Sequence, residues 1–437
     1  MAQNHRSSKT PLMPTTQPTE NQTPPGLLQG VRVLDLTHYI SGPYCTKLMA
    51  TMGAEVIKVE RPGTGDRIRQ FGPFAKTLHS GKIGSSNGPL KLESGAWFLY
   101  LNTSKKSLTL DLKSDEGHEI LGRLAKSSHI LVENFAPAAM DRLNLGPGYL
   151  QGLNPALVMT SISNYGQTGP HRDWKAAEIN LYAAGGLMNI TGEPDQEPLM
   201  EGAPLAQLGA GQNAFVASMA ALMYAEETGK GQHIDVSIAE YAPNILENAL
   251  MQYSYSGQEF NRVGNRGYGR AAWGIYPCRD GYVGIIAGPD HRWPEMAVVM
   301  EREELADPRF GSRNGRMLHA DEVDALMLPW LLDHDKVDIF KAGQEHGFGF
   351  AYVATMEDIL EMEQLVSRNF FVELEHSVAG NLKYPGPPMS HISSLDPDFE
   401  PWVYRRAPLL GEHTVEILDG LGYLPDEVES LRNGGVI

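Results

Sequence analysis

A βαβ unit near the start of the chain constrains the fold more than any other segment. Residues 31–36, Val-Arg-Val-Leu-Asp-Leu, have the pattern of a buried strand, and from Pro43 apolar residues recur at helical spacing. Gly53 then ends the helix, and residues 54–59 form the next strand. Strands joined by a crossover helix lie parallel in one sheet. The segment therefore predicts an α/β protein with a parallel sheet.

Further patterns extend this sheet along the chain. Residues 107–112 alternate with a period of two, and Ser114 is placed to cap a helix that follows. Residues 130–132 and 157–159 add strands at the spacing of αβ units. A longer helix pattern over residues 209–227 leads into another strand. We predict a doubly wound sheet.

Composition limits the possible partners. The chain of 437 residues has 36 Lys and Arg against 53 Asp and Glu, and its net charge of −17 disfavours nonspecific binding to nucleic acid or anionic membranes. No run approaches the roughly 20 apolar residues of a membrane span. Cys45 and Cys278 lie outside any CxxC spacing, and the histidines show no ligand spacing. We expect a cytoplasmic protein with no metal, no nucleic-acid partner and no membrane partner.

The residues suggest five candidate site positions. His38 follows a buried strand, and Asn134 and Phe135 end another, where open α/β sheets bind ligands. Glu178 enters an otherwise apolar run, and a carboxylate there is costly unless it is paired or functional. Gln207 stands among small residues ahead of the long helix, in the manner of an active-site turn. A structural histidine is the commoner outcome at a position such as His38.

An ordered set of segments resembles the class III CoA-transferases, the family of formyl-CoA transferase, carnitine CoA-transferase and α-methylacyl-CoA racemase. The segments begin with the first strand and end near the C-terminus. They are residues 30–36, 53–60, 101–107, 132–135, 141–143, 228–232 and 407–414.

The resemblance implies a Rossmann-like large domain made from both chain ends, a smaller α/β domain from the middle, and two interlocked subunits. We accordingly expect a disordered tail over residues 1–25, which lack the apolar block of a signal peptide. The first part of the large domain spans 26–255 and the small domain 256–370. Residues 371–437 are a linker and the C-terminal return to the large domain.

The same resemblance implies coenzyme A or its acyl thioester as substrate, bound in a groove of the large domain. Cations would hold the phosphates, and an apolar or aromatic surface would suit the adenine. On the matching positions the groove residues are His38, Tyr39, Arg61, Leu110, Asn134, Phe135, Arg142 and Lys175.

The family nucleophile is missing. In the family's transferases an aspartate attacks the thioester and forms an acyl anhydride, and Gln207 stands at its position. An amide cannot form that anhydride. Glu178 matches a glutamate of formyl-CoA transferase, and Ile40 replaces a glutamine that helps there near the thioester. These features most resemble the branch that contains the nucleophile-lacking subunit of succinyl-CoA:benzylsuccinate CoA-transferase.

Four functions remain open at this point. The chain is expected to move CoA from a donor such as succinyl-CoA to a free carboxylic acid, as part of a hetero-oligomer whose other subunit supplies the aspartate. It is alternatively a homodimeric transferase that uses Glu178. A racemase would need a base on each face of the α-carbon, and the racemase branch has a histidine where this chain has Ala177. A non-enzymatic CoA-binding partner is the fourth.

Overall fold

A computed structural model describes residues 26–74, 93–267, 269–389, 392 and 399–437. The expected tail over residues 1–25 lies outside the described part. Six strands form one parallel sheet in the order β3-β2-β1-β4-β5-β6. They are β1 Arg32–Asp35, β2 Glu55–Glu60, β3 Lys106–Thr109, β4 Ile130–Glu133, β5 Val158–Ser163 and β6 His233–Ser237. The α/β prediction with a parallel sheet is confirmed.

The strand order reverses direction at the β1–β4 pair. From β1 the chain proceeds outward through β2 to β3, then returns to place β4 on the other side of β1. In such a sheet, a crevice opens at the carboxyl ends of the two strands where the order reverses. The ends of β1 and β4 are therefore the expected ligand site.

Each face of the sheet carries its own core. On one face α1 (Ser41–Thr51) and α8 (Leu205–Thr228) pack over residues such as Val33, Val56 and Val132. The other face is covered by α4 (Asp115–Lys126), α6 (Pro147–Leu153), α17 (Thr414–Gly420) and α18 (Pro425–Asn433). Ile417 and Leu431 of the last two helices share one cluster with Ile120 of α4. The C-terminal segment thus returns to the same sheet.

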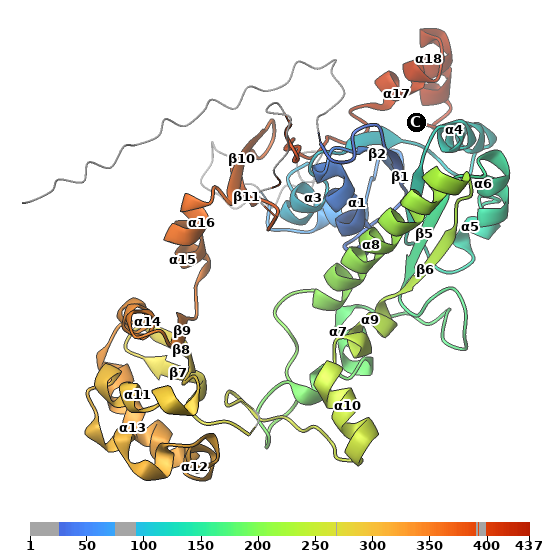
Figure 1. The fold of residues 1–437 in the computed structure, drawn as a ribbon. Helices are drawn as coiled ribbons and strands as arrows, with labels where there is room; N and C mark the ends of the chain where they lie inside the picture. Colours follow the sequence, from blue (N-terminus) through green and yellow to red (C-terminus); the bar gives the residue numbers. More distant parts are fainter. Residues whose placement is uncertain (1–25, 75–92, 268, 390–391, 393–398) are drawn as a thin grey trace, which may run out of the picture.

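The middle of the chain forms a separate unit in Figure 1, drawn in yellow and orange. An antiparallel sheet of β7 (Trp273–Cys278), β8 (Gly281–Ile286) and β9 (Gly349–Tyr352) packs against helices around Trp293, Phe310 and Phe350. The helices are α11 Pro294–Val299, α12 Arg313–Leu318, α13 Ala320–Asp333 and α14 Lys336–Glu345. We call residues 265–352 the middle unit; the exact domain boundaries stay a prediction.

Shorter elements connect these parts. In chain order they are α3 Ala96–Leu101, α5 Ala139–Arg142, α7 Glu178–Ala184, α9 Ile238–Asn244, α10 Glu247–Ser256, α15 Met356–Glu361, α16 Glu363–Ser367, and the hairpin of β10 Phe371–His376 and β11 Gly380–Pro385. In Figure 1, α15, α16 and the hairpin run between the middle unit and the large sheet.

Candidate active site

Three of the predicted groove residues meet at the carboxyl ends of β1 and β4. The backbone N–H of His38 donates to Oδ1 of Asn134 at 2.8 Å, and Nδ2 of Asn134 donates back to the His38 carbonyl at 2.6 Å. The Phe135 ring lies 5.1 Å from the His38 ring, centre to centre. This reciprocal pair joins the two strand ends and places an aromatic surface beside them.

The loop after β1 is held in a defined shape by Asp66. Tyr39 has a φ of 64°, which is uncommon for a residue with a side chain. Its backbone N–H donates to Oδ1 of Asp66 at 3.2 Å, while Nζ of Lys58 lies 3.0 Å from the other oxygen of that carboxylate. The Arg67 guanidinium lies 5.8 Å from the Tyr39 ring centre. Tyr39 is thereby fixed next to the crevice.

A buried ion pair between Lys105 and Asp35 supports the loop that follows β1. Nζ of Lys105 lies 2.9 Å from Oδ2 of Asp35, and both side chains are fully enclosed. Oδ1 of Asp35 accepts from the Thr37 N–H at 2.9 Å. Burial alone would raise the pKa of the Asp35 carboxyl, but Lys105 and Lys58 beside it hold that pKa well below its usual range. The charged aspartate therefore fixes where the loop leaves β1.

The predicted cations of the groove are exposed. Arg61, Arg142 and Lys175 are all exposed, and none of them forms an ion pair within the described residues. Arg142 makes one long hydrogen bond, 3.4 Å from Nη1 to the Pro137 carbonyl. The three charges are thus available for phosphate groups.

The surroundings of His38 favour the neutral form of its imidazole. Burial lowers the pKa of its imidazole, and the nearby charges of Asp66 and Lys58 act in opposite directions on it. A neutral imidazole can accept as well as donate a hydrogen bond. The ring is therefore suited to a polar group of a ligand rather than to a phosphate.

Leu110 differs from the expectation. Its side chain is 2% exposed and lies in the core with Leu108 and Ile120. A side chain enclosed in this way is no wall of an open groove. Only the backbone of Leu110 remains for contact with a ligand.

Gln207 lies within a helix instead of a turn. The long helix begins at Leu205, so Gln207 is in its first turn, with Pro204 as the residue before the helix. The sequence pattern placed that start a few residues later. The helix ends as expected at Gly229, with a φ of 69°.

Glu178 binds the beginning of this helix. One carboxylate oxygen accepts from the Ala206 N–H at 2.6 Å, and the other accepts from the Gln207 N–H at 3.2 Å. The first N–H groups of a helix have no partner within the helix and carry a partial positive charge. The carboxylate of Glu178 is therefore paired, which explains how it is accommodated in an apolar segment.

Glu201 is a site residue that the sequence analysis missed. Burial, together with the Glu178 carboxylate near it, raises the pKa of Glu201. The residue as a whole is partly exposed, yet both of its carboxylate oxygens are shielded from solvent and have no hydrogen-bond partner among the described residues. The signal in the sequence was a lone carboxylate between Met200 and Gly202.

Glu133 is a second residue that was missed as an individual group. It is 3% exposed at the end of β4, and Oε2 accepts from the Phe135 N–H at 2.7 Å. Burial raises the pKa of this carboxyl to about 7, although the bonds from Ser161 and Phe135 act the other way. The site thus holds a carboxyl that titrates near neutral pH.

Close packing brings the Gln207 end of α8 to the loop after β1. A Cβ at Gly211 would lie 2.4 Å from the Ser41 carbonyl, so only glycine allows α1 and α8 this close. Gln207 lies one turn before Gly211 on the same helix face. Ile40 stands directly before α1 and gives its start no side-chain cap. The side chains near the contact between α1 and α8 are thus the amide of Gln207 and the alkyl group of Ile40.

Sequence comparison agrees with this arrangement. The model of CoA-transferase family III matches residues 28–414. The chain is 32% identical over 423 residues to succinyl-CoA–D-citramalate CoA-transferase of Chloroflexus aurantiacus, covering 95% of this chain and 100% of that protein. It is 30% identical over 401 residues to succinate–glutarate CoA-transferase of Agrobacterium fabrum, covering 91% and 96%.

A solved structure has the same fold. A CaiB/BaiF family protein from Brucella suis superimposes with a TM-score of 0.80 at 28% identity, covering 91% of this chain and 100% of that one. The fold, the crevice at the β1–β4 reversal and these matches define one class. The chain belongs to CoA-transferase family III and is a CoA-transferase that acts on acyl-CoA and carboxylic acids.

Within the described ranges no helix is both long and apolar enough to cross a bilayer. The same ranges contain no group of three or more His, Cys, Asp or Glu side chains placed to hold a metal ion.

Proposed function

We propose that this chain moves CoA from an acyl-CoA donor such as succinyl-CoA to a free carboxylic acid, as the subunit that lacks the nucleophile. The observation that carries the proposal is the amide of Gln207 in the first turn of α8, the helix whose Gly211 packs against Ser41 just after the His38 loop. An amide at this position can donate a hydrogen bond but cannot form an anhydride.

The crevice supplies the features that CoA needs. Arg61, Arg142 and Lys175 are free to bind phosphate oxygens, and the rings of Tyr39 and Phe135 provide a surface for the adenine. Such local cations are required because the chain as a whole carries a charge of −17.

Gln207 acts on the thioester as a donor. Its backbone N–H donates to Glu178, and its side-chain amide has no hydrogen-bond partner among the described residues and can reach the thioester oxygen. Succinyl-CoA is proposed as the CoA donor because two similar proteins are named for succinyl or succinate transfer.

The free cysteines Cys45 and Cys278 are buried and suit a reducing compartment, so we place the protein in the cytoplasm.

The catalytic carboxylate is proposed to come from a related subunit, in a hetero-oligomer built like the interlocked dimer. Exposed apolar side chains on α8 support contact with another chain. Val216 is 59% exposed and Met223 is 71% exposed. A helix that is apolar on its outer face as well as its inner face is suited to burial against a partner.

The test is co-purification from the native source followed by an assay. The chain alone should turn over no acyl-CoA, and activity should appear with a related subunit that carries aspartate at the position of Gln207. Full transferase activity of the pure chain would contradict the proposal.

A second candidate is a self-sufficient transferase, and the adjacent carboxyls of Glu178 and Glu201 favour it. Its difficulty is that both oxygens of Glu178 are engaged by α8. A hydroxylamine-sensitive acyl adduct on either glutamate would support this candidate, and activity that survives Glu178→Ala would exclude Glu178 as nucleophile. A racemase lacks support here because Ala177 offers no base.

A further inference from the structure

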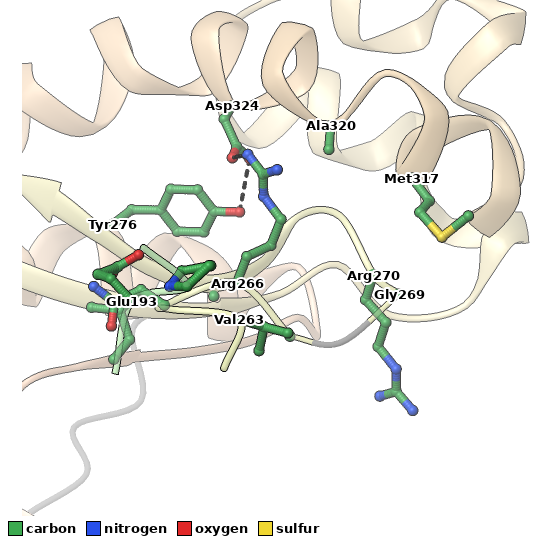
Figure 2. Close-up of a pocket in the computed structure, with 14 residues that line it drawn as sticks. Glu193, Val263, Arg266, Gly269, Arg270, Tyr276, Met317, Ala320 and Asp324 are labelled. Carbon is green, nitrogen blue, oxygen red and sulfur yellow. Dashed lines mark hydrogen bonds and ion pairs between the residues drawn. The ribbon is translucent and has the colours of Figure 1, made fainter. Parts of the chain in front are cut away.

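The middle unit borders a hollow in which arginines and carboxylates are equal in number, since Arg266 and Arg270 line it together with Glu193 and Asp324. The hollow has a volume of about 480 Å³ and is lined by Arg266, Tyr276 and Asp324, among others. Nη2 of Arg266 lies 2.9 Å from Asp321 and 2.5 Å from Asp324, and the Tyr276 hydroxyl donates to Asp324 at 2.9 Å. Figure 2 shows Arg266 reaching toward Asp324 while Arg270 points away. No anion is needed here.

A second hollow, of about 530 Å³, has an excess of positive charge. Arg270, Arg313 and Arg316 line it, and Asp290 is the one carboxylate among its described lining residues. Nη2 of Arg316 donates to Oδ1 of Asp290 at 2.8 Å, and Nη1 donates to the Phe310 carbonyl at 2.9 Å. Asp290 thus neutralises Arg316, and two positive charges remain.

Neither remaining arginine has an acidic partner. Arg270 and Arg313 form no ion pair within the part of the chain that the structure describes, whereas the other arginines of the middle unit do so, except Arg302. Arg313 makes a single weak bond, 3.4 Å from Nη2 to the Gly269 carbonyl. In a chain with a large excess of acidic residues, two unpaired arginines around one hollow indicate a site for an anion.

Arg270 is also held in place. Its guanidinium carbon lies 3.4 Å from the centre of the Trp273 ring, so the planar group stacks on the indole. Stacking uses the face of the guanidinium and leaves its N–H edge free for two parallel hydrogen bonds to a carboxylate. Arg316 lines the same hollow, and its buried Nε–H has no acceptor among the described residues.

We propose that this hollow binds a carboxylate of the acceptor acid between Arg270 and Arg313, and that the acceptor is therefore a dicarboxylic acid. The inference rests on the proposed function, in which one carboxylate of the acceptor becomes the thioester. An acceptor that still binds the arginines as an anion must therefore carry a second carboxylate. The hollow is also lined by the apolar residues Ala271, Ala272 and Ile286, which suit the methylene groups between the two carboxylates of such an acid.

The position of the hollow indicates that an acid bound there reacts in the crevice of a second subunit. In Figure 1 the middle unit is a lobe separate from α7 and α8, which carry Glu178 and Gln207. An acid bound in the hollow is therefore remote from the crevice of the same chain. It can meet a thioester only in the crevice of a second subunit, so a chain without the nucleophile still contributes the acceptor site.

Calorimetry on the full-length chain tests the site, with glutarate as the probe. Glutarate should bind, and neutral dimethyl glutarate should not. Arg270→Gln and Arg313→Gln should each weaken glutarate binding about tenfold or more, since each removes a charge-assisted hydrogen bond. Arg279→Gln is the matched control, because Arg279 pairs with Asp335 and lies outside the hollow. It should change the affinity less than about twofold.

Three outcomes of the glutarate titrations would contradict the proposed carboxylate site. The inference is overturned if wild-type chain binds no glutarate, if both variants bind it as wild type does, or if inorganic phosphate or CoA displaces it from the hollow. CoA titrations separate this outcome from failure of the proposed function. The two variants should keep wild-type affinity for CoA, whereas a chain that binds no CoA at all would contradict the proposed function itself. Thermal unfolding of each variant verifies that it is folded.

Discussion

At the scale of single residues, Glu178 is first a partner of a helix. Its carboxylate accepts from the Ala206 and Gln207 N–H groups, so Glu178→Ala leaves these donors without a partner. We expect a loss of about 1 kcal/mol in the free energy of unfolding. Glu178→Gln, which keeps one acceptor oxygen, should lose less.

Urea unfolding measures this difference, and Glu361→Gln is the control. Glu361 is exposed and its side chain forms no hydrogen bond or ion pair with the described residues, so its substitution should stay within about 0.5 kcal/mol of wild type. Equal stabilities for Glu178→Ala and the control would show that the carboxylate does not hold α8.

Glu133 predicts a pH dependence of stability. Burial raises the pKa of this carboxyl from 4.5 to about 7, so the folded state binds its proton more tightly than the unfolded state. This contribution is full below pH 4.5 and is lost as the pH rises to 7. Glu133→Gln removes that loss, and its stability relative to wild type should increase by roughly 1–3 kcal/mol between about pH 4.5 and 8.

Thermal and urea unfolding of both proteins across this pH range provide the measurement. If the difference between Glu133→Gln and wild type is constant with pH, Glu133 does not titrate in this window.

Sequence patterns located some site residues and missed others for a physical reason. His38, Asn134 and Phe135 follow strands, and the carboxyl ends of adjacent parallel strands must meet. Glu201 joins Glu178 only through the folding of the segment between them, which no periodicity describes. Leu110 was placed by the family resemblance, whereas it directly follows β3 and, like Leu108 two residues earlier, has its side chain in the core.

At the scale of elements, the contact between α1 and α8 positions the candidate site. Gly211→Ala would place a Cβ 2.4 Å from the Ser41 carbonyl and push the two helices apart. We expect a loss of about 1–3 kcal/mol in stability, measured by urea unfolding, together with weaker CoA binding.

Gly152→Ala is the matched control within a helix. A Cβ there meets nothing within 4 Å, so the substitution should be neutral or stabilising. A Gly211→Ala variant as stable as this control would show that α1 and α8 are not in close contact.

The ion pair under the β1 loop makes a second prediction at this scale. Lys105→Met leaves Asp35 charged and buried without its partner, and the expected loss is about 3–5 kcal/mol. The double variant with Asp35→Leu should recover part of that loss. Urea unfolding of the single and double variants gives the coupling, and additive effects would contradict a direct pair.

Elements could be predicted where their signals are local. The β1-α1-β2 unit follows from periodicity and Gly53, and Ser114 caps α4 as expected, accepting from the Gly117 N–H. The start of α8 could not be predicted, because its cap is the carboxylate of Glu178 in another helix. Contacts distant in sequence carry no local pattern.

At the scale of the whole molecule, we propose that different chains supply different parts of the active site. In the proposed scheme the crevice of the sheet binds CoA, Gln207 stands where the family resemblance implies an aspartate, and the middle unit binds an anion away from that crevice. Because the amide of Gln207 cannot form an acyl anhydride, we infer that another chain supplies the acyl-accepting carboxylate for turnover.

Intact-mass spectrometry of the pure chain incubated with succinyl-CoA tests this claim most directly. Wild-type chain should stay unmodified, because its amide cannot take up an acyl or CoA group. The Gln207→Asp variant should gain a hydroxylamine-sensitive adduct at that position. An adduct on wild-type chain, or none on the Gln207→Asp variant when CoA is bound, would contradict the account.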